Sequence, residues 1–323
     1  MKPEEIIFTG DNSTDEEMLA CHDQGVIVNA GSLSQLDRLG RLRPGARVSV
    51  RINPDVGAGH HSHCITGGPH TKFGIYHDLL PEILALVQRH RLALVGIHCH
   101  IGTGILDAAK FLEAMDITLG VARKVPGLEF VDFGGGLGIA YREEQQPLDL
   151  REFGARVSRH FEKFCGEYGK PLELKIEPGR FLVCQAGTLL ARVNTLKDTP
   201  AHHFVGCDTG FNHLIRPMAY GSYHRIVNAS RVEGPQRQSV LCGNICESGD
   251  VFTQSSEGIE DRLVSEFRAG DVVAILDAGA YGMSMSMQYN IRPRPPEVLV
   301  GQDGGLRVIR RRETYEDIMA GYV

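Results

Sequence analysis

Short apolar runs alternate with amphipathic stretches over the first half of the chain. The apolar runs predict six strands, at residues 6–10, 26–30, 48–54, 94–98, 130–133 and 172–176. Between them, capping residues and helical spacing of apolar residues predict helices that begin near residue 12 and cover about 33–39, 79–89, 108–124 and 153–168. Strands that alternate with helices predict an α/β fold with a parallel sheet.

Polar or glycine-rich residues follow the later strands at their carboxyl ends. They are Asn53-Pro54-Asp55, His98-Cys99-His100, Gly134-Gly135-Gly136 and Glu177-Pro178-Gly179-Arg180. Reactive groups in this position are typical of a (β/α)8 TIM-type barrel, which has eight βα units. The pattern predicts only about six such units here.

The pattern changes after about residue 187. Strand-like runs at 188–194, 238–243, 271–276 and 297–300 are separated by segments rich in turn residues. We therefore predict two domains, an incomplete barrel over residues 1–186 and a mainly β domain over residues 187–323.

The composition is that of an ordinary globular protein, with 323 residues of which 42% are hydrophobic and 23% charged. A net charge of -6 without a basic cluster argues against a nucleic-acid partner. No apolar run approaches the ~18 residues of a membrane span, and the first residues lack the pattern of a signal peptide. The 8 scattered cysteines form no paired CxxC motif, which favours a reduced, cytoplasmic protein.

The stretch Leu172–Arg180 brings a carboxylate, Glu177, and a guanidinium, Arg180, to the end of a predicted strand. This pair suits a cofactor that has a basic ring nitrogen at one end and a phosphate at the other. The alternative is a structural ion pair, which would be the better interpretation of an isolated Glu-x-x-Arg motif.

His98-Cys99-His100 ends the fourth predicted strand, and two histidines in this spacing also begin many metal sites. A metal site would need further His or Asp ligands at other strand ends, and those ends instead offer glycines and Glu177-Pro178-Gly179-Arg180, so we predict no metal. A histidine that only caps its strand is another alternative. In the functional interpretation, the His100 ring stacks on an aromatic cofactor and Thr103 reaches a phosphate.

Two further clusters in the first domain have weaker signals. Gly134, Gly135 and Gly136 would let backbone N–H groups approach a phosphate, although tight turns use glycine as well. His60, His61 and His63 lie beside Cys64, and without other residues at metal-ligand spacing we interpret them as an exposed loop.

Three clusters stand out in the second domain. Arg216 and Tyr220 offer a guanidinium and a phenol to a carboxylate, Cys246-Glu247-Ser248-Gly249-Asp250 offers a thiol and acids, and Tyr281 lies in a turn of small residues. Each alone is more often structural than functional, but the three together are unusual.

With these motifs in view, the chain resembles the alanine-racemase-like (fold type III) pyridoxal-phosphate decarboxylases, and among them the diaminopimelate decarboxylases. The resemblance runs from about residue 4 to the end. Five motifs carry it, in the order of the family: His98–Thr103, Asp132–Gly136, Glu177–Arg180, Cys246–Asp250 and Gly279–Tyr281.

The resemblance implies a pyridoxal 5'-phosphate cofactor, a small amino-acid substrate and a homodimer with shared active sites. Glu177 would pair with the pyridine nitrogen and His100 would stack on the ring. The phosphate would be held by Gly134, Gly135, Gly136, Thr103 and Tyr281, and Arg180 would lie in the same site. The distal end of the substrate would be bound by Arg180, Arg216 and Tyr220. From the second subunit, Cys246 would donate a proton and Glu247 would bind the distal amino group, which favours meso-2,6-diaminopimelate, decarboxylated to L-lysine and CO2.

The chain departs from the family in one respect. The family attaches its cofactor to a lysine in a Tyr-x-x-Lys-Ala-Asn-like motif at the end of the first barrel strand, and no lysine of this chain lies in such a motif. The six predicted strands match the third to eighth of the family. We therefore expect an N-terminally truncated form that folds poorly and does not decarboxylate alone.

Two other functions remain open. One is a catalytically inactive binding or regulatory homologue that has lost the lysine, although the retained cofactor and substrate residues argue against it. The other is a related decarboxylase that acts on another amino acid or on a carboxylated polyamine.

Overall fold

The computed structural model describes residues 1–59 and 66–323, and it divides into two compact units. Unit 1 comprises Met1–Ala140 and Gln146–Phe181, and unit 2 comprises Tyr141–Gln145 and Leu182–Val323. Among the described residues, no helix has both the length and the apolar character needed to cross a membrane.

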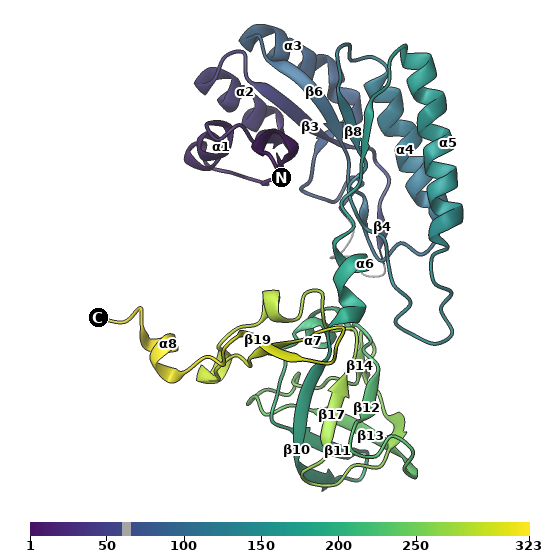
Figure 1. The fold of residues 1–323 in the computed structure, drawn as a ribbon, viewed down its shortest axis with the longest axis vertical. Helices are drawn as coiled ribbons and strands as arrows, with labels where there is room; N and C mark the ends of the chain where they lie inside the picture. Colours follow the sequence, from purple (N-terminus) through teal and green to yellow (C-terminus); the bar gives the residue numbers. More distant parts are fainter. Residues whose placement is uncertain (60–65) are drawn as a thin grey trace. The chain divides into compact units, whose positions relative to one another are not determined.

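Unit 1 is built on an open parallel sheet (Figure 1). Its strands follow one another in the order β1-β2-β3-β6-β8-β9, and β5 pairs with β3. The bounds of these strands are β1 (Ile7–Phe8), β2 (Ile27–Ala30), β3 (Arg47–Asn53), β5 (Ile75–Tyr76), β6 (Ala93–His98), β8 (Phe130–Asp132) and β9 (Glu173–Lys175). A separate short pair consists of β4 (Ala58–Gly59) and β7 (Gly102–Thr103). The prediction of a barrel-type sheet with about six βα units is confirmed.

Helices connect the strands of this sheet. They are α1 (Asp15–His22), α2 (Leu33–Leu42), α3 (Leu80–His90), α4 (Ala108–Ala122) and α5 (Leu150–Tyr168), while α6 (Gly179–Val183) follows β9. Capping side chains set where these helices begin, because the first N–H groups of a helix have no partner within it. Thr14 accepts from Glu17 N, whose carboxylate accepts from Thr14 N, and Asp149 accepts from Arg151 N and Glu152 N.

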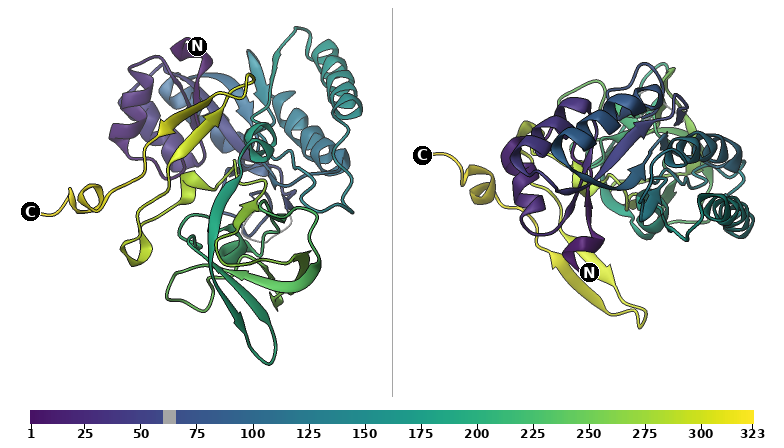
Figure 2. Two further views of the ribbon diagram at one scale, coloured as in Figure 1. Left: turned by 60° about the horizontal axis from the view of Figure 1, so that its bottom comes forward. Right: turned by 90° about the horizontal axis from the view of Figure 1, so that it is seen from above.

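Alternation along the strands sorts their side chains between two faces of the sheet. Val28, Val48, Val50 and Val131 join the main apolar core together with residues of the helices. In Figures 1 and 2, α4 and α5 lie side by side. The other face carries a small apolar cluster of Ile7, Ile27, Val95 and Phe130, followed towards the carboxyl ends by the buried polar residues Asn29, Ser49, Arg51, His98 and Asp132.

Gly96 illustrates how tightly the inner face is packed, and we expect Gly96→Ala to destabilise the protein by about 1–3 kcal/mol. A Cβ at this position would lie 2.1 Å from the Phe130 ring, which is buried and has little room to shift. Urea unfolding checks this expectation. The matched control is Gly120→Ala in α4, where a Cβ meets nothing within 4 Å, and it should stabilise by about 0.5–1 kcal/mol. Equal effects of the two substitutions would contradict the packing argument.

Unit 2 is mainly β, as predicted. Its largest sheet has the order β12-β17-β10-β11-β13-β16, with β11 and β13 parallel and the other pairs antiparallel. The bounds are β10 (Leu189–Asp198), β11 (His203–Cys207), β12 (Ile226–Asn228), β13 (Gln236–Cys242), β16 (Arg262–Ser265) and β17 (Val272–Ile275). The core of this sheet is formed by Val193, Val205, Leu241, Phe252, Val273 and Ile275.

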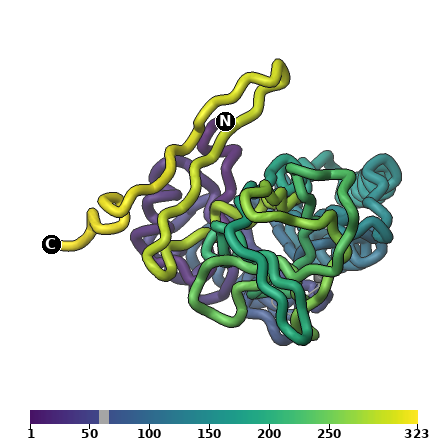
Figure 3. Tube along the Cα trace, turned by 90° about the horizontal axis from the view of Figure 1, so that it is seen from below, coloured from purple at the N-terminus to yellow at the C-terminus, as the bar shows by residue number. Residues whose placement is uncertain are grey.

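Unit 2 also contains two hairpins, two short α-helices and the 3-10 helices Cys184–Ala186, Met283–Met285 and Tyr289–Ile291. One hairpin is β14 (Gln254–Ser255) with β15 (Gly258–Ile259); the other, β18 (Glu297–Val300) with β19 (Leu306–Arg310), forms the two-stranded arm in Figure 3. The helices are α7 (Arg216–Tyr220) and α8 (Tyr315–Met319). The sequence pattern predicted β10, β13, β17 and β18 but missed the shorter or glycine-interrupted strands such as β11 and β12.

Candidate functional site

Three ionisable side chains gather at the carboxyl ends of β6, β8 and β9. The ligand atoms of His98, Asp132 and Glu177 all lie within 4.8 Å of one another. His98 is 1% exposed and Asp132 is 2% exposed, whereas the Glu177 side chain is 43% exposed. The site is therefore an accessible carboxylate backed by a buried imidazole and a buried carboxyl group.

Glu177 is held in its anionic form. The contact with His98 is the main cause that lowers its pKa, and the nearby positive charge of Arg51 acts in the same direction, against burial. The pKa of Asp132 is raised because burial disfavours its charge. Its Oδ1 accepts from Gly134 N at 2.9 Å, which opposes this shift only in part. The pKa values of the two carboxyl groups are thus shifted in opposite directions, and Glu177 carries the accessible negative charge.

His100 presents a neutral ring to the site. Burial, with the positive charge of Arg51, lowers the pKa of His100 to about 4. Its Nδ1 accepts from Gly135 N at 3.0 Å, which fixes the orientation of the ring. A neutral, flat and anchored imidazole is suited to stacking on an aromatic cofactor, the role that the sequence predicts for it.

The low pKa of His100 predicts that the folded protein loses stability in acid. Below pH ~6.5 an unfolded chain protonates this histidine while the folded chain does not, so the free energy of unfolding should fall by about 3 kcal/mol as the pH drops to 4. His100→Asn keeps an acceptor near Gly135 N but does not titrate. Urea unfolding from pH 7 to 4 should therefore show a shallower pH dependence for this variant. Identical slopes would contradict the assignment.

The glycine turn after β8 packs backbone against backbone. Gly134 and Gly136 have φ values of +66° and +98°, which favour glycine. A Cβ on Gly135 would lie 2.1 Å from the Glu177 carbonyl oxygen, and one on Gly136 would lie 2.4 Å from that of Gly102. The turn is therefore a side-chain-free surface next to the loops that follow β6 and β9.

Thr103 and Arg180 meet beside this turn. Arg180 Nε donates to Thr103 Oγ1 at 3.2 Å, and the Arg180 side chain is buried. Glu177 and Arg180 thus have different neighbours in unit 1: the first pairs with His98 and the second with Thr103.

Sequence reasoning missed several polar residues of this site. Arg51 is buried, with Nη1 3.5 Å from Asp11 Oδ2 and its guanidinium carbon 4.5 Å from the Phe73 ring centroid. Asn29 contacts His98, and Ser49 in turn donates to Asn29. Their signal was polar residues at alternate positions of strands that are otherwise apolar. The histidine cluster His60–His63 with Cys64 lies outside the described residues.

Unit 2 holds the remaining predicted residues. Arg216 is fully buried in α7, its Nη1 donates to His224 Nε2 at 2.8 Å, and its guanidinium carbon lies 5.1 Å from the Tyr141 ring centroid. His224 Nδ1 in turn donates to the Leu276 carbonyl oxygen at 2.9 Å. Tyr220 ends the same helix. The orientation of the Arg216 side chain is therefore fixed by contacts within unit 2.

Asp250 stabilises the Cys246-Glu247 turn through hydrogen bonds to the backbone. This buried carboxylate accepts from Phe211 N and Ile245 N, both at 2.7 Å, so it has a structural role that the sequence did not reveal. Cys246 is exposed, and its N–H donates to Asn290 Oδ1 at 3.0 Å. Tyr281 is 44% exposed and has a φ of +58°.

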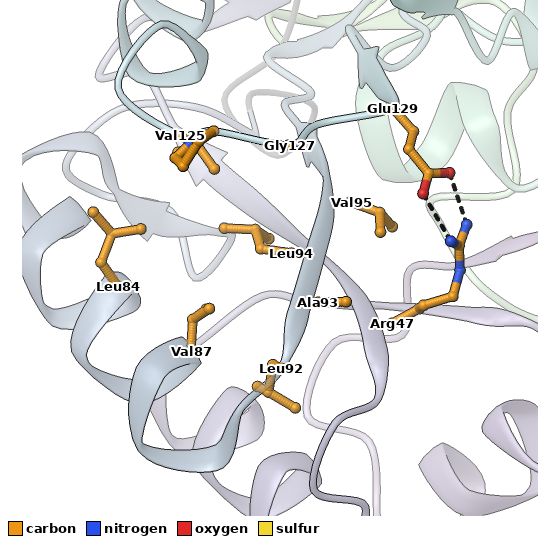
Figure 4. Close-up of a pocket in the computed structure, with 11 residues that line it drawn as sticks. Arg47, Leu84, Val87, Leu92, Ala93, Leu94, Val95, Val125, Gly127 and Glu129 are labelled. Carbon is orange, nitrogen blue, oxygen red and sulfur yellow. Dashed lines mark hydrogen bonds and ion pairs between the residues drawn. The ribbon is translucent and has the colours of Figure 1, made fainter.

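A hollow at the opposite end of the unit 1 sheet has different chemistry (Figure 4). It is lined by aliphatic side chains and by the ion pair of Arg47 with Glu129, at 2.7 Å, near the amino ends of β3 and β8. Barrel-type folds carry their chemistry at the carboxyl ends of the strands. The His98–Asp132–Glu177 cluster is therefore the better candidate for the active site.

Comparisons with known proteins agree on one family. The sequence profile described as "Pyridoxal-dependent decarboxylase, pyridoxal binding domain" matches residues 1–184. The chain is 46% identical over 328 residues to the diaminopimelate decarboxylase of Methanothermobacter thermautotrophicus, covering 99% of this chain and 74% of the relative. It is 41% identical over 329 residues to the diaminopimelate decarboxylase of Escherichia coli K12, covering 98% of this chain and 77% of the relative.

Solved structures show the same likeness. A crystal structure of diaminopimelate decarboxylase superposes with a TM-score of 0.92 at 41% identity, covering 98% of this chain and 77% of that one. The Helicobacter pylori diaminopimelate decarboxylase complexed with L-lysine superposes with a TM-score of 0.88 at 30% identity, covering 99% of this chain and 79% of that one.

Proposed function

Because this chain belongs to the family of pyridoxal-dependent diaminopimelate decarboxylases, we propose that it converts meso-2,6-diaminopimelate to L-lysine and CO2. The observation that carries this proposal is the accessible, anionic Glu177 beside the neutral ring of His100. An anionic carboxylate and a stacking ring are what a protonated pyridine ring requires. The Helicobacter pylori relative is complexed with L-lysine, which is the product expected of this reaction.

The residues of unit 1 fit pyridoxal 5'-phosphate. When bound, this cofactor supplies an electron sink for the pair of electrons released with CO2. Glu177 would accept a hydrogen bond from the ring nitrogen and keep it protonated, and His100 would stack on the ring. The side-chain-free surface of Gly134, Gly135 and Gly136, which a Cβ would fill, supports a role in holding the phosphate.

The phosphate would gain further partners from side chains. We assign this role to the Thr103 hydroxyl, to Arg180 and to Tyr281. Arg180 is the charged member of this set, and its hydrogen bond to Thr103 supports a shared role of the two residues in binding the phosphate. Such a charge-assisted contact would bind a phosphate more strongly than neutral donors would.

The substrate would be recognised at its distal end. We assign the distal carboxylate to Arg180, Arg216 and Tyr220, and the distal amino group to Glu247. The Cys246 thiol would donate a proton to the carbon that loses CO2. In this proposal two copies of the chain form a homodimer, and Cys246 and Glu247 act in the site of the partner copy.

The described cysteines support a cytoplasmic location for this function. All seven of them, at positions 21, 99, 165, 184, 207, 242 and 246, are free thiols. Free thiols are the usual state of cysteines in a reducing compartment.

Product analysis tests this function with the gene product expressed from its complete reading frame. With pyridoxal 5'-phosphate present, meso-diaminopimelate should release CO2 and form L-lysine in equal amounts, while L-ornithine and L-arginine should release little. Arg216→Ala should lower kcat/KM for diaminopimelate. Arg237→Ala should not, because the Arg237 side chain, in β13, is 41% exposed and pairs with Asp198. Equal turnover of ornithine, or an unharmed Arg216→Ala enzyme, would contradict the substrate assignment.

A further inference from the structure

A chain of buried polar groups leads to Glu177. Ser49 Oγ donates to Asn29 Oδ1 at 2.9 Å, and Asn29 Nδ2 lies 2.9 Å from His98 Nδ1. His98 Nε2, which makes no hydrogen bond with the described residues, lies 3.5 Å from Glu177 Oε2, so the carboxylate is the polar group that it faces. Ser49, Asn29 and His98 are at most 1% exposed, so water does not compete for these bonds. The chain crosses neighbouring strands β2, β3 and β6 on the inner face of the unit 1 sheet.

The direction of every bond follows from the carboxylate. An anionic carboxylate only accepts hydrogen bonds, so the ring nitrogen that faces Glu177 carries the proton. A neutral imidazole has a single N–H, so Nδ1 is an acceptor and the amide nitrogen of Asn29 must face it. The amide oxygen then faces Ser49, whose hydroxyl donates to it. The polarity of the four groups is therefore consistent along the whole chain.

We propose that Ser49, Asn29 and His98 form a positioning relay that locks His98 as the Nε2–H tautomer and so orients the Glu177 carboxylate for the ring nitrogen of the cofactor. The identity of the cofactor rests on the proposed function, whereas the tautomer does not. His98 is a positioning residue in this scheme, because it acts through Glu177.

The relay would fix the orientation of the Glu177 side chain before the cofactor binds. The Glu177 side chain is 43% exposed, so it would otherwise lose conformational freedom only when the cofactor binds, which weakens binding. A neutral donor orients the carboxylate without adding a full positive charge that would compete with a protonated ring nitrogen. The 3.5 Å separation leaves the carboxylate free to face the cofactor as well.

A divalent metal on the same side chains would require the opposite tautomer. His98 would then bind the ion through a lone pair on Nε2, carry its proton on Nδ1, and face the oxygen of Asn29. The tautomer of His98 therefore distinguishes the relay from a metal site made of His98, Asp132 and Glu177.

Nitrogen NMR of the purified protein measures this tautomer directly. In protein labelled with ¹⁵N-histidine and without added cofactor or metal, the His98 signals, assigned by their loss in His98→Gln, should show Nε2 protonated and Nδ1 unprotonated at pH 7. Asn29→Ala should give a mixture of tautomers. A ring protonated on Nδ1, or on both nitrogens, in the unsubstituted protein would overturn the proposal.

Cofactor affinity tests the consequence for Glu177. Asn29→Ala should bind pyridoxal 5'-phosphate about fivefold more weakly, as expected for one lost hydrogen bond, and the milder Ser49→Ala should change affinity in the same direction if Asn29→Ala does not fold. Asn228→Ala removes an amide that is also 1% exposed but lies in unit 2, and it should leave the His98 tautomer unchanged.

The outcomes separate the relay from the proposed function. Unchanged cofactor affinity in the folded Asn29→Ala and Ser49→Ala variants would overturn the relay. If the unsubstituted protein binds no pyridoxal 5'-phosphate while His98 is the Nε2–H tautomer, the proposed function fails and the tautomer assignment stands.

Discussion

Replacing Glu177 by glutamine should lower kcat/KM for diaminopimelate decarboxylation by about 10²- to 10³-fold. Glutamine keeps the shape and one acceptor oxygen, but it has no negative charge. His98 would still donate to that oxygen, so the backbone and the relay should remain in place. The loss would therefore report the charge that keeps the pyridine nitrogen protonated, since a neutral ring is a weaker electron sink.

The control for this substitution lies on the adjoining strand. Glu173, in β9, is exposed and pairs with Lys175 at 2.9 Å. Glu173→Gln makes the same chemical change four residues away and should leave kcat/KM within about twofold, because exposed ion pairs contribute little. Steady-state kinetics and the absorption spectrum of the bound cofactor check both variants. A Glu177→Gln enzyme that keeps its full activity would remove the basis of the proposed function.

The sequence was sufficient to predict the sheet and the polar residues that gather at its carboxyl ends. Buried parallel strands show as apolar runs, and the ends of such strands meet at one edge, so residues such as His98 and Glu177 could be placed together without coordinates. The comparisons confirm the family to which the resulting motifs pointed. Regular spacing and chain direction carried this part of the prediction.

Other residues of the site could not be predicted, because their roles depend on contacts far apart in sequence. Asn29 is the one polar residue of β2, and Ser49 is one of the alternating polar residues of β3. Only strand pairing shows that the two line up with His98. Asp250 belonged to a motif that offered a thiol and acids, yet it is buried and accepts hydrogen bonds from two backbone N–H groups. Burial and partner identity are tertiary properties that a local pattern does not encode.

The relay also bears on whether this chain is an inactive binding homologue. Burying Ser49, Asn29 and His98 costs free energy unless each polar atom finds its partner. Apolar residues at these positions would pack the inner face with less demand on geometry. A polar row that ends at an accessible carboxylate is consistent with selection for a cofactor site, which favours the enzyme over a protein that binds only through its surface.

Mixing two inactive variants should restore about a quarter of the normal activity if the sites are shared between copies. Glu177→Gln damages the residues that unit 1 contributes, and Cys246→Ala removes the proposed proton donor of unit 2, which should cost about 10²-fold or more by itself. When the two are co-expressed, half of the dimers are mixed. One of the two sites in each mixed dimer then receives intact Glu177 from one copy and intact Cys246 from the other.

The control mixture combines two variants that damage the same side of the site. Glu177→Gln with His100→Ala should restore nothing, because every site in every dimer lacks one of the two residues. Activity is measured on the whole co-expressed mixture of dimers, isolated by size-exclusion chromatography. If the Glu177→Gln and Cys246→Ala pair also restores nothing, Glu177 and Cys246 act from the same chain, and the assignment of Cys246 to the partner's site is wrong. If activity returns in the Glu177→Gln and Cys246→Ala mixture but not in the control mixture, the catalytic proton donor and the cofactor carboxylate come from different copies.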